Sequence, residues 1–143
     1  MSIPLPKPGL VIRYSFLWSS EHEAGALEGK KDRPCAIVVA VPQGDSGQIR
    51  TIVAPITHSV LVDPSMSLEI PVNVCKTLGL DSARHWIRFD ELNRFTWPGY
   101  DLRPKPDGTF YYGMLPRGLF EDLRNGIVEA QKARRTQFGS RDE

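Results

Sequence analysis

A proline followed by an unbroken apolar run is the feature that most restricts how this chain folds. Pro34 fixes its own φ angle and pushes Arg33 toward an extended conformation, and Cys35–Val41 then reads CAIVVAV. A run of this length beside turn residues is typical of a buried strand. The turn Pro42–Gly47 and the partner run Ile49–Ile56 follow directly, so we predict an antiparallel pair of strands at the centre of the fold.

Other segments have the alternation, or the β-branched and aromatic residues, of strands. They are Gly9–Trp18, Ser67–Ile70, His85–Phe89 with Asp90–Trp97 extending it, and Thr109–Met114. Two segments lack such a pattern. Ser19–Asp32 carries glycines and acids and is predicted to be a long mobile loop, and Tyr100–Gly108 is predicted to be a surface excursion.

Two helices are expected in the second half of the chain. Pro71–Leu78 is predicted to be a two-turn helix that Gly79 stops at the C′ position. Pro116 opens the only long helix predicted, and Arg134–Glu143 after it has no periodicity and is expected to fray. The apolar residues at helical spacing in the long helix are Leu119, Phe120, Leu123, Ile127, Val128 and Ala130.

Short strands followed by one covering helix, without βαβ alternation, favour a mainly β, α+β fold. We expect a small, strongly bent antiparallel barrel with a short helix and one C-terminal helix. The length of 143 residues fits a single domain over residues 1–143. The sequence contains no internal repeat and no phosphate-binding P-loop motif.

Charge and composition exclude several classes of protein. The formal net charge of +1 and the 41% hydrophobic content fit a globular protein and not a disordered tail or a polybasic arm. Arginine outnumbers lysine, twelve to six, and arginine is the residue that forks onto phosphates and stacks on bases. No apolar run reaches the roughly 18 to 20 residues that span a bilayer. Because the N-terminus also lacks a signal-peptide core, we expect a cytoplasmic protein without a membrane partner.

The cysteines and histidines form no motif for a disulfide or a metal. Cys35 and Cys75 are expected to be buried as small hydrophobic residues. There is no CxxC pair and no HExxH, and His22, His58 and His85 are far apart in the sequence. We therefore expect neither a metal nor another cofactor.

Arg33 and Thr57 are the candidate functional residues. Arg33 comes at the start of one predicted strand and Thr57 at the end of the next. A permanently charged, forked donor beside a hydroxyl suits a site that handles phosphate or carboxylate. Two less specific interpretations stay open: Arg33 pairs with an acid such as Asp32 or Glu28, and Thr57 serves strand packing.

The order of these motifs resembles the MazF/PemK family of toxin endoribonucleases. The resemblance is carried by Gly-Leu-Val near the start, a loop with Gly and Glu, Arg-Pro before an apolar strand, and Val-Ala-Pro-Ile-Thr, all between Gly9 and Ser59. Asp90–Phe95 and the C-terminal helix continue it. It implies an SH3-like barrel, a homodimer, and a toxin of a type II toxin–antitoxin system that cleaves single-stranded RNA without a metal or cofactor. It also implies a cognate antitoxin as partner, with DNA reached only through that antitoxin.

The resemblance places the catalytic roles on Arg33 and Thr57. RNA is cleaved when its 2′-OH attacks the adjacent phosphate, so an enzyme must align the backbone and neutralise charge on the phosphoryl oxygens. Arg33 would supply that charge, and Thr57 would hydrogen-bond a substrate oxygen. The expected RNA-binding residues are Glu23, Lys31, Pro34, His58, Ser59 and Arg94.

The position of His58 and the activity itself each have an alternative. His58 could transfer protons, but consecutive strand residues point to opposite faces, so beside Thr57 it is expected to lie outside the pocket. Two other functions stay open because one fold hosts several activities. One is a toxin with the same barrel that binds a protein target such as DNA gyrase, and the other is a catalytically silent RNA- or protein-binding module.

Overall fold

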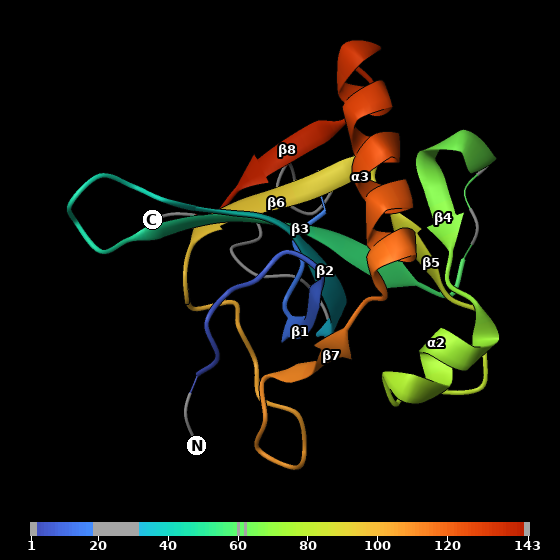
Figure 1. The fold of residues 1–143 in the computed structure, drawn as a ribbon, viewed down its shortest axis with the longest axis horizontal. Helices are drawn as coiled ribbons and strands as arrows, with labels where there is room; N and C mark the ends of the chain where they lie inside the picture. The colour runs from blue at the N-terminus through green and yellow to red at the C-terminus, as the bar shows by residue number, and fades with distance from the viewer. Residues whose placement is uncertain (1–2, 19–31, 60, 62, 142–143) are drawn as a thin grey trace.

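The computed structural model describes residues 3–18, 32–59, 61 and 63–141, and this part of the chain is mainly β (Figure 1). It forms eight strands, two α-helices and one short 3₁₀ helix. The strands are β1 Leu10–Tyr14, β2 Arg33–Pro42, β3 Ile49–Thr57, β4 Ser67–Glu69, β5 Trp86–Arg88, β6 Glu91–Thr96, β7 Tyr111–Met114 and β8 Gln137–Ser140. The helices are η1 Pro64–Met66, α2 Val72–Thr77 and α3 Arg117–Lys132. The predicted α+β class, with a short helix and one long C-terminal helix, is confirmed.

The strands make one open sheet whose main path runs β4-β5-β3-β2-β1-β7. β6 lies off this path against β3, and β8 pairs with β6 in parallel. The other ladders of the described residues are antiparallel. Figure 1 shows α3 crossing the sheet, while α2 lies below β4 and β5. The long β2–β3 hairpin predicted from the apolar run is therefore the centre of the sheet.

One edge of β3 is paired by two different strands. Arg50–Val53 pair with β6, whereas Ile56 and Thr57 pair with β5. The sequence predicted one continuous strand over His85–Trp97, and this was wrong. β5 and β6 are separate strands that meet β3 at successive positions, so β3 joins two parts of the sheet.

Local hydrogen bonds account for the break between β5 and β6. The N–H of Phe89 donates to the carbonyl of Met66 at 3.0 Å. The carboxylate of Asp90 accepts from both Nε and one terminal nitrogen of Arg88, at 3.1 and 2.8 Å. These contacts turn the backbone out of the ladder at residues 89 and 90.

Two hydrophobic clusters use the alternating faces of the central strands. One contains Val11, Ala36 and Ala54 and is covered by Leu123 and Ile127 of α3. The other is the aromatic cluster, and it contains Tyr14, Phe16, Phe95 and the buried Ile12 and Ile37. Both faces of β1, β2 and β3 are thus buried, which explains the near-continuous apolar sequence of β2.

The apolar run of β2 is buried only over its first half. Cys35, Ala36 and Ile37 are fully buried, but Val39 and Val41 are 36% and 47% exposed. The register of β2 against β3 shifts between Ile37 and Val39, and beyond this bulge the hairpin extends away from the sheet (Figure 1). The expectation that all of Cys35–Val41 lies at the centre was therefore wrong at its end.

The helices begin and end close to where the sequence predicts. Gly79 follows α2 with φ of +73°, the left-handed conformation expected of a C′ glycine. In α3, Gly126 packs so closely on Phe89 that a Cβ there would lie 2.8 Å from the ring. Val128, predicted to belong to the apolar stripe, is 40% exposed, because the buried face runs through Leu123 and Ile127.

The prediction that the chain frays after α3 is wrong as far as residue 141. Gln137–Ser140 form β8 along Glu91–Arg94, and the side chain of Arg141 is buried against Asp101. The segment Tyr100–Gly108, which was predicted to be a surface excursion, is held to the sheet in part, because Leu102 is buried and forms a β-bridge with Tyr14. Both segments are held by partners far away in the sequence, which local patterns do not indicate.

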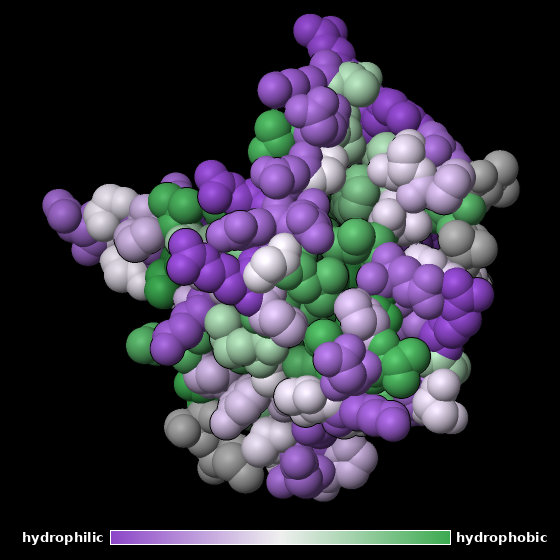
Figure 2. Space-filling model, turned by 45° about the vertical axis from the view of Figure 1, so that its right-hand side comes forward, coloured by the Kyte–Doolittle hydropathy of each residue, from purple (hydrophilic) through white to green (hydrophobic). Residues whose placement is uncertain are grey.

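One face of the molecule is seen in the space-filling view. Figure 2 shows hydrophilic residues over most of the face it presents, with hydrophobic residues gathered toward the middle. Among the described residues, no helix is long and apolar enough to cross a membrane.

Candidate functional site

A pocket of about 280 Å³ opens where β2 begins and β3 ends. Its lining comes from these two strand ends, from the segment after α2, and from β7. The lining residues are Asp32, Arg33, Pro34, Ile56, Thr57, His58, Gly79, Leu80, Asp81, His85 and Tyr112. Both predicted catalytic residues thus lie in one pocket.

The antiparallel register brings Arg33 and Thr57 to the same end of the sheet. Cys35 is opposite Pro55 and Ala36 is opposite Ala54. Moving outward along this ladder leads to the first residue of β2, Arg33, and the last residue of β3, Thr57. Their proximity therefore follows from the hairpin that the sequence predicts.

Arg33 belongs to a stack of cations and aromatic rings. Its guanidinium carbon lies 5.2 Å from the ring centre of Trp18, and that of Arg88 lies 4.4 Å from the same ring. Such contacts hold a guanidinium without neutralising its charge. Arg33 therefore brings a guanidinium to the wall of the pocket, beside the carboxylate of Asp32.

Asp32, beside Arg33, is contacted by two other arginines. The Nε atoms of Arg13 and Arg103 lie 3.7 Å from its two carboxylate oxygens. Tyr112 lies in the same wall, and its burial raises the pKa of its phenol above the ordinary value, with Arg13 acting in the opposite direction. The phenol is thus neutral at neutral pH and can donate a hydrogen bond.

Thr57 is 8% exposed, and its hydroxyl already has an acceptor. The hydroxyl donates to the carbonyl of Ser59 at 3.1 Å. Because a hydroxyl has one proton, its oxygen in this rotamer faces a ligand only as an acceptor. The resemblance implied that Thr57 hydrogen-bonds a substrate oxygen, and donation to a phosphate oxygen requires the hydroxyl to turn away from Ser59.

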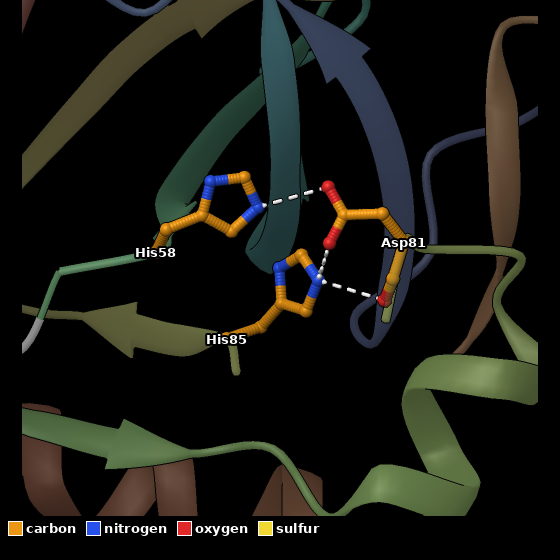
Figure 3. Close-up of side chains that lie close together, drawn as sticks. All are labelled: His58, Asp81 and His85. Carbon is orange, nitrogen blue, oxygen red and sulfur yellow. Dashed lines mark hydrogen bonds and ion pairs between the residues drawn. The ribbon is translucent and has the colours of Figure 1, made fainter. Parts of the chain in front are cut away.

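His58, Asp81 and His85 form a cluster at the pocket wall (Figure 3). The Nε2 of His58 lies 3.2 Å from one carboxylate oxygen of Asp81. The Nε2 of His85 lies 3.0 Å from the other oxygen and 3.3 Å from the carbonyl of Asp81. The two rings are 4.7 Å apart between centres. We call these three residues the pocket cluster.

The carboxylate of Asp81 is charged at neutral pH. Its pKa lies below the ordinary value, first because it accepts a hydrogen bond from the N–H of Ala83 and then because of the two imidazoles. An ionised carboxylate only accepts hydrogen bonds, so each imidazole that faces it donates from Nε2. In a neutral imidazole the other nitrogen, Nδ1, then carries the lone pair.

The pocket cluster corrects one expectation and removes the reason given for another. His58 was predicted to lie outside the pocket by strand alternation, but Thr57 is the last residue of β3, so the alternation ends before His58. A metal site was not expected because the histidines are far apart in the sequence. The structure brings His58 within ring contact of His85, since β3 and β5 pair at Thr57 and Trp86.

The remaining predicted site residues divide into three groups. Pro34 lines the pocket, and Ser59 contributes the carbonyl that binds Thr57. Arg94 is not among the pocket-lining residues; it lies on β6 with its guanidinium 5.0 Å from the ring centre of Phe138. Glu23 and Lys31 lie outside the described residues.

Sequence reasoning did not select Asp81, His85 or Tyr112 as site residues. The sequence held one indication of these residues. Asp81 and His85 are four residues apart and follow closely on Gly79, where α2 was predicted to end. The cysteine prediction is confirmed, because Cys35 and Cys75 are both buried and unbridged. Burial raises the pKa of the Cys35 thiol, so it is not a reactive thiolate.

No family model matches the chain, and no curated protein matches it either. The residues of the pocket therefore carry the functional argument. They combine a fixed cation, a hydroxyl, and an imidazole beside a carboxylate. This combination can bind an anion and move a proton next to it.

Proposed function

We propose that this protein is a toxin-type endoribonuclease that cleaves single-stranded RNA and so inhibits growth, with an SH3-like barrel of the MazF/PemK kind as its fold. The observation that carries the proposal is that Arg33, Thr57 and His58 line one pocket. The first two were expected there from the sequence. His58 adds the proton-transfer group that the reaction needs.

In the proposed reaction the RNA supplies its own nucleophile. The 2′ oxygen forms a bond to the adjacent phosphorus, the bond from phosphorus to the 5′ oxygen of the next nucleotide breaks, and a cyclic phosphate remains. The proton of the 2′-OH must leave, and the departing 5′ oxygen must gain one. No oxidant, reductant or metal enters this balance.

The pocket residues fit these requirements. Arg33 neutralises the charge that develops on the phosphoryl oxygens and donates the proton that the departing 5′ oxygen gains; water returns a proton to Arg33 as His58 releases one. Nδ1 of His58 accepts the 2′-OH proton, while Asp81 holds the ring through Nε2. Thr57 positions the ribose by accepting a hydrogen bond through its oxygen, or the phosphate after its hydroxyl turns away from Ser59. Tyr112 and Pro34 complete the wall against which the RNA backbone lies.

The binding partners of the protein are predictions from the family resemblance. From the resemblance we expect a homodimer and a cognate antitoxin that blocks the pocket, with DNA contacted only through the antitoxin. Light scattering of the purified chain tests the first, and co-purification with the product of an adjacent small reading frame tests the second.

The test is cleavage of a long single-stranded RNA in EDTA by the wild type, Arg33→Ala and Thr57→Ala. Each variant is expected to lose about a hundredfold or more in rate. Arg117→Ala is the matched control, because Arg117 is 92% exposed and, within the described part of the chain, its ion pair is with Glu121 on α3. The control should cleave like the wild type.

Two results would overturn the proposal. If the folded wild type leaves RNA intact, the protein is a binding module or a toxin with a protein target. Inhibition of DNA gyrase that tolerates Arg33→Ala would then favour the second. If the wild type and both pocket variants cut equally, the cleavage belongs to a contaminant or to another site.

A further inference from the structure

The pocket cluster has a feature that proton transfer by His58 alone does not require. Two imidazole nitrogens from separate segments of the chain point at the same carboxylate (Figure 3). One potential ligand atom from each of His58, Asp81 and His85 lies within 4.8 Å of the other two. Two nitrogens and one carboxylate oxygen form a ligand set that suits divalent transition metals.

We propose that His58, Asp81 and His85 bind a divalent transition-metal ion of the zinc type, and that this ion switches the pocket off. The metal site stands on the geometry alone. The inhibition rests on the proposed function, because it requires that His58 takes part in cleavage.

The ligand atoms must move closer together to bind such an ion. Zinc lies about 2.0–2.2 Å from nitrogen and oxygen ligands, so two ligand atoms at the tetrahedral angle are about 3.3–3.6 Å apart. The present limit of 4.8 Å must therefore shorten by about 1.2 to 1.5 Å. The side chains of His58 and Asp81 are 54% and 61% exposed and can make this movement.

His85 supplies the fixed part of the site. Its side chain is 5% exposed, and packing therefore holds the ring in place while the other two ligands adjust. Three protein ligands leave one tetrahedral position of a zinc ion unfilled. Because all three residues line the pocket, that position is accessible to a water or a phosphate oxygen.

Binding of the ion changes what His58 can do. A neutral imidazole that binds the ion through Nε2 carries its proton on Nδ1, so the proton that Nε2 now donates to Asp81 moves to Nδ1. Nδ1 then has no lone pair left to accept a proton. His58 can no longer accept the 2′-OH proton, and cleavage stops until the ion leaves.

The binding experiment is isothermal titration calorimetry, with zinc chloride titrated into the full chain. The protein is first freed of metal with EDTA and then dialysed to remove the EDTA. We expect one zinc ion per chain. Magnesium, which prefers oxygen ligands, should not compete. His85→Gln and Asp81→Asn should each weaken zinc binding at least about tenfold.

Asp107→Asn is the matched control for binding, because Asp107 is an exposed aspartate outside the pocket. His85 is buried, so His85→Gln is used only if its thermal unfolding is cooperative. Asp81→Asn changes an exposed side chain and decides the question if His85→Gln fails to fold. Equal zinc affinity in the wild type and Asp81→Asn, or no binding by the wild type, would overturn the metal site.

The cleavage experiment compares each protein with and without zinc, normalised to its own rate in EDTA. Zinc should suppress the wild type and Asp107→Asn at concentrations that have little effect on Asp81→Asn. A wild type that binds zinc at this site and still cuts RNA would overturn the inhibition. A wild type that binds zinc but never cuts RNA would contradict the proposed function and leave the metal site supported.

Discussion

Two charged groups in this protein are assembled from distant parts of the chain, and they differ most in burial. The buried pair is Asp101 with Arg141, whose side chains are each 2% exposed. Nε and one terminal nitrogen of Arg141 donate to the carboxylate at 3.0 and 3.3 Å. In the pocket cluster, by contrast, His58 and Asp81 are more than half exposed.

The difference separates a structural role from a chemical one. Charges removed from water must be matched by partners inside the protein, and such a pair tolerates no loss of one member. Water reaches the pocket cluster, so Asp81 can exchange one imidazole partner for a proton, an ion or a ligand at low cost. Convergence from distant segments therefore does not identify a functional site unless the group is also accessible.

The largest effect is expected from Asp101→Ala. The change removes the carboxylate that faces buried Arg141 and should lower the free energy of unfolding by about 3–5 kcal/mol, measured by urea denaturation. Glu69→Ala is the matched control, because Arg84 binds Glu69 with the same two-bond geometry on the surface. Equal shifts in the two variants would show that burial is not the cause.

A charge-free replacement sharpens this test. Asp101→Leu combined with Arg141→Met removes both charges and should recover most of the stability that Asp101→Ala loses, because hydrophobic replacements of buried ion pairs are often neutral or stabilising. A double variant as unstable as Asp101→Ala would mean that the hydrogen-bond geometry, and not the isolated charge, is responsible.

His58→Ala tests the opposite side of the comparison. If His58 transfers the 2′-OH proton, the cleavage rate should fall about 10²–10⁴-fold, while the urea midpoint stays close to that of the wild type because the side chain is half exposed. Cleavage at the wild-type rate would remove His58 from the chemistry. A large loss of stability would make the pocket cluster structural, like the buried pair.

A smaller effect is expected at Tyr14, in the aromatic cluster. Its hydroxyl is buried, and it has no hydrogen-bond partner among the described residues. Burial, with Asp101 adding to it, raises the pKa of this phenol well above the ordinary value, so it stays neutral. Tyr14→Phe should leave the free energy of unfolding unchanged or raise it by up to about 1 kcal/mol. A clear drop would show that the hydroxyl is hydrogen-bonded in solution.

The smallest effect concerns pH and the exposed pair of Glu69 and Arg84. The hydrogen bond from Arg84 lowers the pKa of Glu69 below its usual 4.5. Its stabilisation is therefore present above pH 4.5 and is lost as the pH falls through the lower folded-state pKa. The small stability difference between wild type and Glu69→Gln should close on acidification. If the stability difference between the wild type and Glu69→Gln persists at a pH below the folded-state pKa of Glu69, the ionised carboxylate is not its cause.

Local rules in the sequence determined much of this structure. The apolar run of β2, its partner β3 and the proline and glycine at the helix ends predicted the central hairpin, α2 and α3, because strand alternation and capping act over a few residues. The hairpin also brought Arg33 and Thr57 to the same end of the sheet. The register between them depends on the bulge between Ile37 and Val39 as well as on the turn.

The tertiary structure alone decided what surrounds them. The pairing of β8 with β6 and the burial of Arg141 on Asp101 depend on contacts between residues 40 or more positions apart, which no local pattern encodes. The same holds for the pocket cluster. His58 meets His85 only because β5 pairs with the end of β3, and that pairing depends on how the whole sheet packs beneath α3.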